Sequence, residues 1–87
     1  GSKEETRFSY SYLDYNKAIE CNPSYFKAYF NRGFAYDRIG DVNKAISDYS
    51  RALQIDPYNA YCYYNRGISY DKKGMPEEAI KNFTKAI

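Results

Sequence analysis

The chain has 87 residues and a net charge of +2 with both signs interspersed, a balance that implies neither a strongly basic nor a strongly acidic partner. Hydrophobic residues make up 44% of it, including 12 Tyr and 5 Phe, which is too apolar and too aromatic for a disordered chain. This length allows one compact domain or a short segment of a longer array. Gly1-Ser2 is typical of a cloning-tag remnant, so the fold prediction leaves it out.

Five helices joined by short turns are predicted along the chain. Their expected ranges are, in order, Thr6 to Cys21, Ser24 or Tyr25 to Ile39, Val42 to Ile55, Ala60 to Lys73, and Pro76 to Ile87. In the first range apolar residues recur three, four and seven positions apart, the spacing of one buried helical face. Ser24 and Asp41 are the expected N-caps, and Gly40 and Gly74 are expected as the glycines that follow helix ends.

The strongest pattern in the sequence is an internal repeat, in which the segment 26–59 begins again at Ala60. When the two copies are superposed, Asn31-Arg32-Gly33 falls on Asn65-Arg66-Gly67, and Ala45-Ile46 falls on Ala79-Ile80. Self-similarity at a fixed period of this length indicates stacked structural repeats, and it outranks any local interpretation.

Small residues recur where the predicted helices would cross. Gly33 and Gly67 lie in the middle of helices, where glycine costs about 1 kcal/mol relative to alanine. A recurring glycine at such a place predicts that a neighbouring helix passes too close for a side chain. Alanines of the partner helices and large aromatic side chains beside them would then interdigitate.

The order of large, small and turn residues resembles the tetratricopeptide repeat (TPR). The residues that carry this resemblance are Tyr29, Gly33, Tyr36, Gly40, Ala45, Tyr49, Ala52 and Pro57 in one copy, Tyr63, Gly67, Tyr70, Gly74, Ala79, Phe83 and Ala86 in the next, and Tyr15, Ala18 and Pro23 in a partial first copy. The resemblance implies an all-α fold of antiparallel helix-turn-helix repeats, stacked in a right-handed α-solenoid. It divides the chain into 1–25, a tag remnant and the second half of a first repeat, 26–59, a complete repeat, and 60–87, a repeat truncated after its second helix.

Two arginines depart from the family pattern. Arg32 and Arg66 stand where the family usually has leucine. We expect the stem of each arginine to pack against its neighbours while its head group meets Asp14 or Asp48.

The resemblance also implies a binding groove, because in TPR-like arrays the first helix of each repeat lines a concave surface that usually holds a peptide. The groove-facing positions would be Lys27, Phe30, Asn31, Phe34, Asp37 and Arg38, and in the next repeat Tyr61, Tyr64, Asn65, Ile68, Asp71 and Lys72. Some of these are apolar at positions that the core does not need, which indicates an interaction surface: Phe30, Phe34, Tyr64 and Ile68. Asn31 and Asn65 are expected to hydrogen-bond an extended peptide backbone. The alternative is that the whole set only packs repeat on repeat.

Non-catalytic protein–protein interaction, with a peptide or partner protein in this groove, is therefore the predicted function. A TPR subclass that grips the C-terminal carboxylate of chaperone tails is disfavoured: Asn31 matches its clamp, but Tyr61 and Asn65 stand where the clamp needs lysine and arginine.

Self-association is the first alternative, since apolar residues at the two flanks would be partly exposed: Phe8 and Tyr12 at one end, and Ile80, Phe83 and Ile87 at the other. We expect some homo-oligomer at high concentration. Single-stranded nucleic acid is a remote alternative, because tyrosines interleave with Lys27, Arg38 and Lys72. It is disfavoured by the low net charge and by Asp37 and Asp71 beside those cations.

Catalysis has little support in the sequence. There is no histidine to act as a base for Cys21 or Cys62, and no phosphate loop, metal-ligand cluster or calcium loop. We therefore predict no enzyme activity, no small-molecule substrate, no metal and no cofactor. No apolar run approaches the length of a membrane-spanning helix, and two unpatterned cysteines favour free thiols in the cytoplasm.

Overall fold

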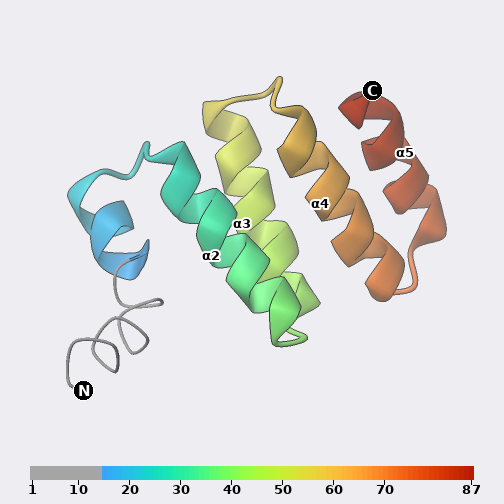
Figure 1. The fold of residues 1–87 in the computed structure, drawn as a ribbon, viewed down its shortest axis with the longest axis horizontal. Helices are drawn as coiled ribbons and strands as arrows, with labels where there is room; N and C mark the ends of the chain where they lie inside the picture. Colours follow the sequence, from blue (N-terminus) through green and yellow to red (C-terminus); the bar gives the residue numbers. More distant parts are fainter. Residues whose placement is uncertain (1–14) are drawn as a thin grey trace, which may run out of the picture.

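The computed structural model describes residues 15–87, of which 15–21 are helical. Four further helices follow, with the bounds α2 Phe26–Arg38, α3 Val42–Ile55, α4 Ala60–Lys72 and α5 Pro76–Ala86 (Figure 1). The predicted bounds of these four helices are confirmed to within two residues. The start of the first predicted helix, with Phe8 and Tyr12, lies outside the described residues.

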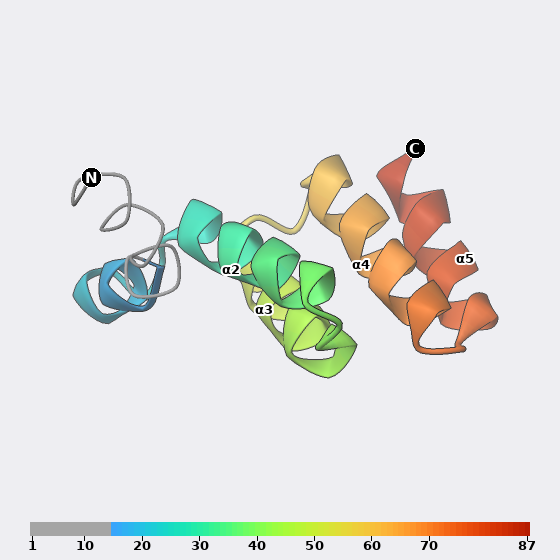
Figure 2. The same ribbon diagram turned by 60° about the horizontal axis from the view of Figure 1, so that its bottom comes forward.

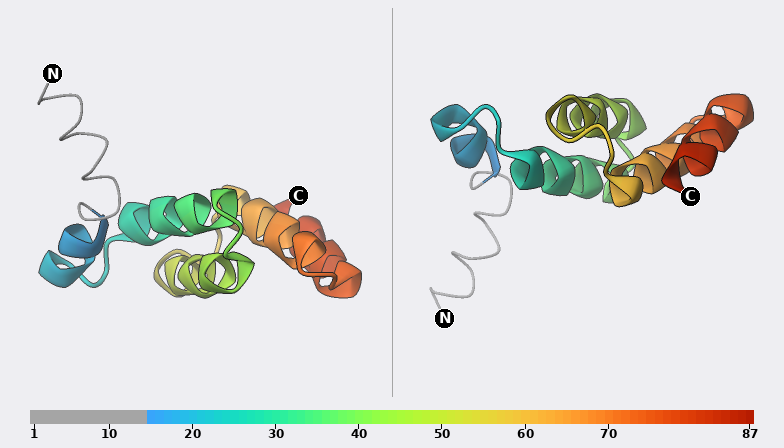
Figure 3. Two further views of the ribbon diagram at one scale, coloured as in Figure 1. Left: turned by 90° about the horizontal axis from the view of Figure 1, so that it is seen from below. Right: turned by 90° about the horizontal axis from the view of Figure 1, so that it is seen from above.

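The helices form two antiparallel pairs, α2 with α3 and α4 with α5, and α3 packs against α4 to join the pairs. Figure 2 shows α2 beside α3 and α4 beside α5, with the two helices of each pair running in opposite directions. The two views of Figure 3 place α2 and α4 in one layer and α3 in another. The described part of the chain is therefore all-helical, with pairs stacked side by side as the internal repeat predicts.

Each helix pair is closed by the same glycine turn. Gly40 and Gly74 have φ angles of +90° and +85°, in the left-handed region that side chains other than glycine rarely adopt. This conformation lets the amide of Asp41 donate to the carbonyl of Tyr36 at 2.9 Å, and the amide of Met75 to that of Tyr70 at 2.9 Å. The predicted roles of both glycines are thus confirmed.

The helix starts differ from one another. Asp41 caps α3, where its side chain accepts from the amide of Lys44 at 3.2 Å. The prediction of Ser24 as the cap of α2 is wrong, because Tyr25 occupies the N-cap position with no side-chain hydrogen bond. The amide of Ser24 instead donates to the side chain of Asn22 at 3.1 Å, and this turn holds Ser24 outside the helix.

Two glycines set the distance between the helices of each pair. A Cβ added to Gly33 would lie 3.0 Å from the ring of Tyr49, and one added to Gly67 would lie 2.6 Å from the ring of Phe83. Both would also lie 3.2 Å from a backbone carbonyl oxygen of the facing helix. The predicted close approach is confirmed, and aromatic rings occupy the space that a side chain at either glycine would need. Fully buried small residues complete the contact: Ala45, Ala52, Cys62 and Ala79.

We expect Gly67→Ala to lower the stability of the chain. The gain in helix propensity is at most about 1 kcal/mol, whereas forcing a methyl group against Phe83 in a packed interface typically costs about 1–3 kcal/mol. In the background of Phe83→Leu, a smaller and more adaptable side chain, the same Gly67→Ala change should cost less. Urea unfolding followed by circular dichroism measures this coupling as a double-mutant cycle. A Gly67→Ala variant as stable as the parent chain would contradict this account.

Candidate functional site

Arg32 and Asp48 join the two helices of the first complete repeat. The Nε and Nη2 atoms of Arg32 donate to the two carboxylate oxygens of Asp48 at 2.8 and 2.7 Å, while Nη1 donates to the side chain of Asn16 at 2.8 Å. The side chain of Asp48 is only 5% exposed, so this is a nearly desolvated two-point ion pair. The hydrogen bond to Asp48 raises the pKa of Arg32. The prediction that Arg32 meets Asp48 is confirmed.

In the second repeat an arginine also links the two helices, but its partners carry no carboxylate. Nε of Arg66 donates to the side-chain oxygen of Asn82 at 2.7 Å, and Nη1 donates to the hydroxyl of Ser50 at 3.1 Å. Asn82 occupies the position in the second copy that Asp48 occupies in the first, so it is the repeat partner of that aspartate. The prediction that Arg66 meets Asp48 is wrong, because each arginine binds the residue 16 positions later in its own repeat, which is Asn82 for Arg66. Asp14, the other predicted partner, lies outside the described residues.

We expect Asp48→Ala to destabilise the chain by about 3 kcal/mol, since it leaves the Arg32 charge partly buried without its partner. Asp48→Asn should cost less, about 1 kcal/mol, because it recreates the arrangement of Arg66 and Asn82 found one repeat later. Urea unfolding of the two variants and the parent chain measures both values. Equal losses for the two substitutions would show that the side-chain acceptor at this position does not matter.

Asp37 links one repeat to the next. Its two carboxylate oxygens accept from the hydroxyl of Ser69 at 2.8 Å and from the ammonium of Lys72 at 2.7 Å. Ser69 is fully buried, and the Asp37 side chain is only 12% exposed. Two residues predicted to face a ligand therefore bind each other across α2 and α4. This role of Ser69 could not be predicted from the sequence, because nothing in the spacing of the repeat indicates a contact between residues 32 apart.

The remaining predicted groove residues separate into exposed and half-buried groups. The exposed group lies on α2 and α4 and consists of Lys27, Asn31, Phe34, Arg38, Tyr61, Tyr64, Asp71 and Lys72. Three of these are large and apolar: Phe34 is 44%, Tyr61 76% and Tyr64 53% exposed. We call these three residues the aromatic face. One side of the Tyr64 ring packs 5.7 Å from the ring of Phe83, and the rest of it is exposed.

Phe30, Asn65 and Ile68 are half-buried. Phe30 packs against the core, with its ring 5.7 Å from that of Tyr49, so the expectation that the core does not need this position is wrong. The side-chain amide of Asn65 donates to the carbonyl of Tyr61 in its own helix at 2.8 Å. That contact already uses the side-chain donor of Asn65 that was expected to bind a peptide backbone.

The two cysteines have opposite environments. Cys62 is fully buried, and its thiol donates to the backbone carbonyl of Tyr49 at 3.3 Å. Burial raises the pKa of Cys62 to about 12. Cys21 is exposed, and both thiols are free. Within residues 15–87 no group of three or more His, Cys, Asp or Glu side chains has the arrangement of a metal site, and no helix is long and apolar enough to cross a membrane.

We expect a thiol reagent at neutral pH to label Cys21 rapidly and Cys62 only on unfolding, because Cys62 is buried and stays protonated. Linkage adds a pH dependence. Below pH 9, the ordinary pKa of the thiol, the folded and unfolded chains hold the same proton; between pH 9 and about 12 only the folded chain holds it, so stability falls as the pH rises through this window. Cys62→Ala should lose this contribution, and unfolding curves across that window compare the two chains. Rapid labelling of both thiols in the folded chain would contradict the buried position.

Two antiparallel helix pairs, matching in sequence and built with glycine turns and small residues at the crossings, define a helical-repeat protein. The family model of the tetratricopeptide repeat matches residues 26–59 and 60–87, and the chain belongs to this family. TPR proteins typically act as non-enzymatic protein-interaction scaffolds. The division that assigns residues 1–25 to half of an earlier repeat stays a prediction.

Similar solved structures include several of the protein MamA. Two crystal structures of MamA are 36% identical to this chain with TM-scores of 0.83, and cover 86% of it and 41% and 44% of their own chains. A MamA structure designated AMB-1 is 29% identical with a TM-score of 0.84, over 95% of this chain and 49% of its own. The chain thus spans less than half the length of these relatives. No curated protein matches it in sequence.

Proposed function

We propose that the chain is a non-catalytic protein-interaction segment that binds a peptide of a partner protein across the exposed side of α2 and α4. The exposure of the aromatic face on two neighbouring helices is the observation that carries this proposal. Large apolar side chains gathered on one layer of a folded chain mark interaction surfaces, and tyrosine is among the residues most enriched at binding hot spots. Membership of the TPR family supports the same conclusion.

The groups around the aromatic face favour a ligand with apolar side chains and little net charge. Lys27 and Arg38 contribute positive charge, Asp71 contributes negative charge, and Lys72 is neutralised by Asp37. Asn31 is exposed and offers both a donor and an acceptor to a peptide backbone. Such a surface gives binding that depends weakly on salt, in contrast to the steep dependence of a nucleic-acid contact.

Self-association is a second candidate function, and Ile80 supports it. Ile80 on α5 is 63% exposed, whereas its repeat partner Ile46 is half-buried on α3, which packs against α4. A second copy that contributes a helix to α5 would cover Ile80 in the same way. We place the protein in a reducing compartment such as the cytoplasm, because both cysteines are free thiols.

The proposal is tested with peptides that are selected from a displayed library for binding to the parent chain. We expect the double substitution Phe34→Ala and Tyr61→Ala to lower the affinity for the selected peptides about tenfold or more, because each substitution removes an exposed anchor. Tyr58→Ala is the matched control: Tyr58 is 91% exposed but lies in the turn before α4, so its loss should leave affinity unchanged. Titration at two salt concentrations, followed by fluorescence anisotropy, gives the affinities.

Circular dichroism of the double variant should match the parent chain, since neither side chain belongs to the core cluster. Peptides that bind the double variant as tightly as the parent chain would overturn the proposal, as would a selection that returns no saturable binder. Light scattering of the parent chain across a range of concentrations separates this function from self-association through α5.

A further inference from the structure

The two repeats leave their arginines in different electrostatic states. Arg32 binds both oxygens of the Asp48 carboxylate, which neutralises its charge. Among the residues that the structure describes, Arg66 has only neutral acceptors, the amide oxygen of Asn82 and the hydroxyl of Ser50. Within residues 15–87 its Nη2 atom has no hydrogen-bond partner, although the matching atom of Arg32 donates to Asp48 at 2.7 Å.

The side chain of Asn82 explains why this donor is left over. Its amide nitrogen donates to the backbone carbonyl of Glu78 at 2.8 Å, which fixes the amide oxygen toward Arg66. A carboxylate at this position supplies two acceptors, as Asp48 does, whereas the fixed amide supplies one. Within the described residues the guanidinium of Arg66 therefore has no carboxylate partner, and some of its N–H groups stay unused.

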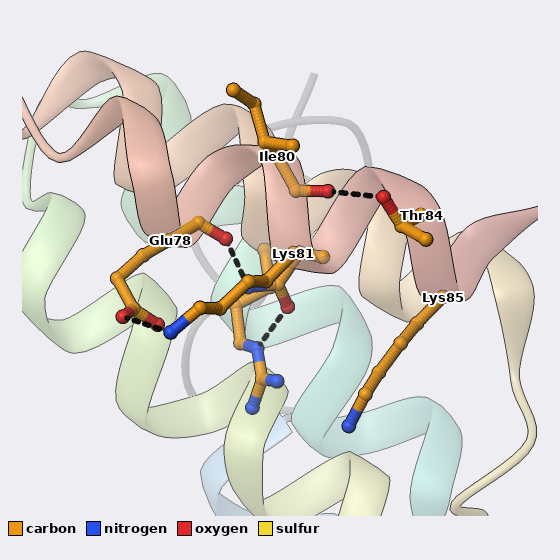
Figure 4. Close-up of a pocket in the computed structure, with 7 residues that line it drawn as sticks. Glu78, Ile80, Lys81, Thr84 and Lys85 are labelled. Atoms are coloured by element: carbon orange, nitrogen blue, oxygen red, sulfur yellow. Dashed lines mark hydrogen bonds and ion pairs between the residues drawn. The ribbon is translucent and has the colours of Figure 1, made fainter.

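Arg66 is one of the residues that line a hollow of about 410 Å³ beside α5, together with Glu78, Ile80, Lys81, Asn82, Thr84 and Lys85. Figure 4 shows Lys81 turned toward Glu78, with which it forms an ion pair at 3.4 Å, while Lys85 extends along the other side of the hollow. Lys85 has no ion pair within residues 15–87; its ammonium and the guanidinium of Arg66 each lie 5.5 Å from the centre of the Tyr63 ring.

The Tyr63 ring thus holds two positive groups near the hollow, and neither is paired with a carboxylate. The lining as a whole has three cations and one carboxylate, and that carboxylate is already paired with Lys81. A guanidinium with unused N–H groups and an ammonium line the same hollow, and these are the two cations that proteins use to bind oxyanions.

We propose that this hollow is an oxyanion-binding site, in which Arg66 and Lys85 hold a carboxylate or phosphoryl group of a partner peptide. Arg66 supplies directed hydrogen bonds in place of those that Asp48 receives in the repeat before, and Lys85 supplies a mobile point charge. The site shares no residue with the aromatic face, so it adds a second point of attachment, with its own ligand chemistry, to the described part of the chain.

Inorganic phosphate and acetate are the probes for the first test, each titrated into isotope-labelled chain at low ionic strength. We expect a saturable shift of the side-chain Nε–H resonance of Arg66, which a merely structural arginine would not show. Saturation by phosphate, by acetate or by both supports the site. Two peptides are then compared, one carrying a single phosphoserine and one carrying a single glutamate. The peptide that saturates the site at the lower concentration shows whether the natural ligand is a phosphoryl group or a carboxylate. A linear, unsaturated response to both ions would overturn the proposal.

Asn82→Asp tests the mechanism, because it gives Arg66 the internal carboxylate that Arg32 has in Asp48. We expect this variant to bind the saturating ion about tenfold more weakly, the loss expected when a charge-assisted hydrogen bond is removed. Asn43→Asp is the matched control, since it adds the same charge at an exposed position of α3 outside the hollow, and its binding should be unchanged. Equal weakening in the two variants would reveal a general charge effect and would overturn the site.

Lys85→Gln keeps the test decisive if the Asn82→Asp chain fails to fold by circular dichroism. The Lys85 ammonium contacts only the Tyr63 ring within the described part of the chain, so the substitution should leave the fold intact. We expect the substitution to lower the affinity for the ion about threefold or more, in line with the loss of one charge at a partly exposed site. Unchanged affinity would overturn the assignment of Lys85 and, with an unfolded Asn82→Asp chain, the site as a whole.

Discussion

The close approach of a glycine to an aromatic ring is the contact on which the rest of this structure depends. Gly33 under Tyr49 and Gly67 under Phe83 bring the two helices of each pair so near that only hydrogen fits between backbone and ring. At this separation the polar side chains of one helix reach those of the other, and Arg32 meets Asp48 across the pair. The arginine bridges are therefore a consequence of the glycines, since a wider pair would leave the guanidinium in water.

The stacking of one pair on the next combines apolar packing of α3 on α4, in which Cys62 joins the core cluster, with a polar link. Within a pair the contact is mostly aromatic on small residues, whereas Asp37 reaches from α2 to α4 and binds Ser69 and Lys72 through charge-assisted hydrogen bonds. A polar link of this kind fixes which residues face outward. It withdraws Asp37 from the surface and leaves the aromatic face as the largest apolar feature that α2 and α4 share.

Repetition makes the differences between the copies informative. A position that changes while its surroundings stay the same was not required by the fold, and Asp48 and Asn82 are such a pair. In the first copy Asp48 neutralises Arg32 and links α3 to α2. In the second copy the guanidinium of Arg66 has no carboxylate partner within the described residues, and it lies over the same Tyr63 ring as the ammonium of Lys85. The described part of the chain thus has an apolar surface on α2 and α4 and a cationic one on α4 and α5.

The sequence alone determined the helices, their glycine turns and the mid-helix contacts, because a repeat that brings Gly33 into register with Gly67 admits one way of pairing. It also determined that Arg32 needed an acidic partner. Only the tertiary structure decided which residues of the predicted groove remain available, because hydrogen bonds between residues 32 and 35 apart, such as those of Asp37, leave no trace in the periodicity. The same limit applies to Phe30, which is half-buried because its ring packs against that of Tyr49. The partner of Arg66, by contrast, follows from the repeat, because Asn82 is the counterpart of Asp48.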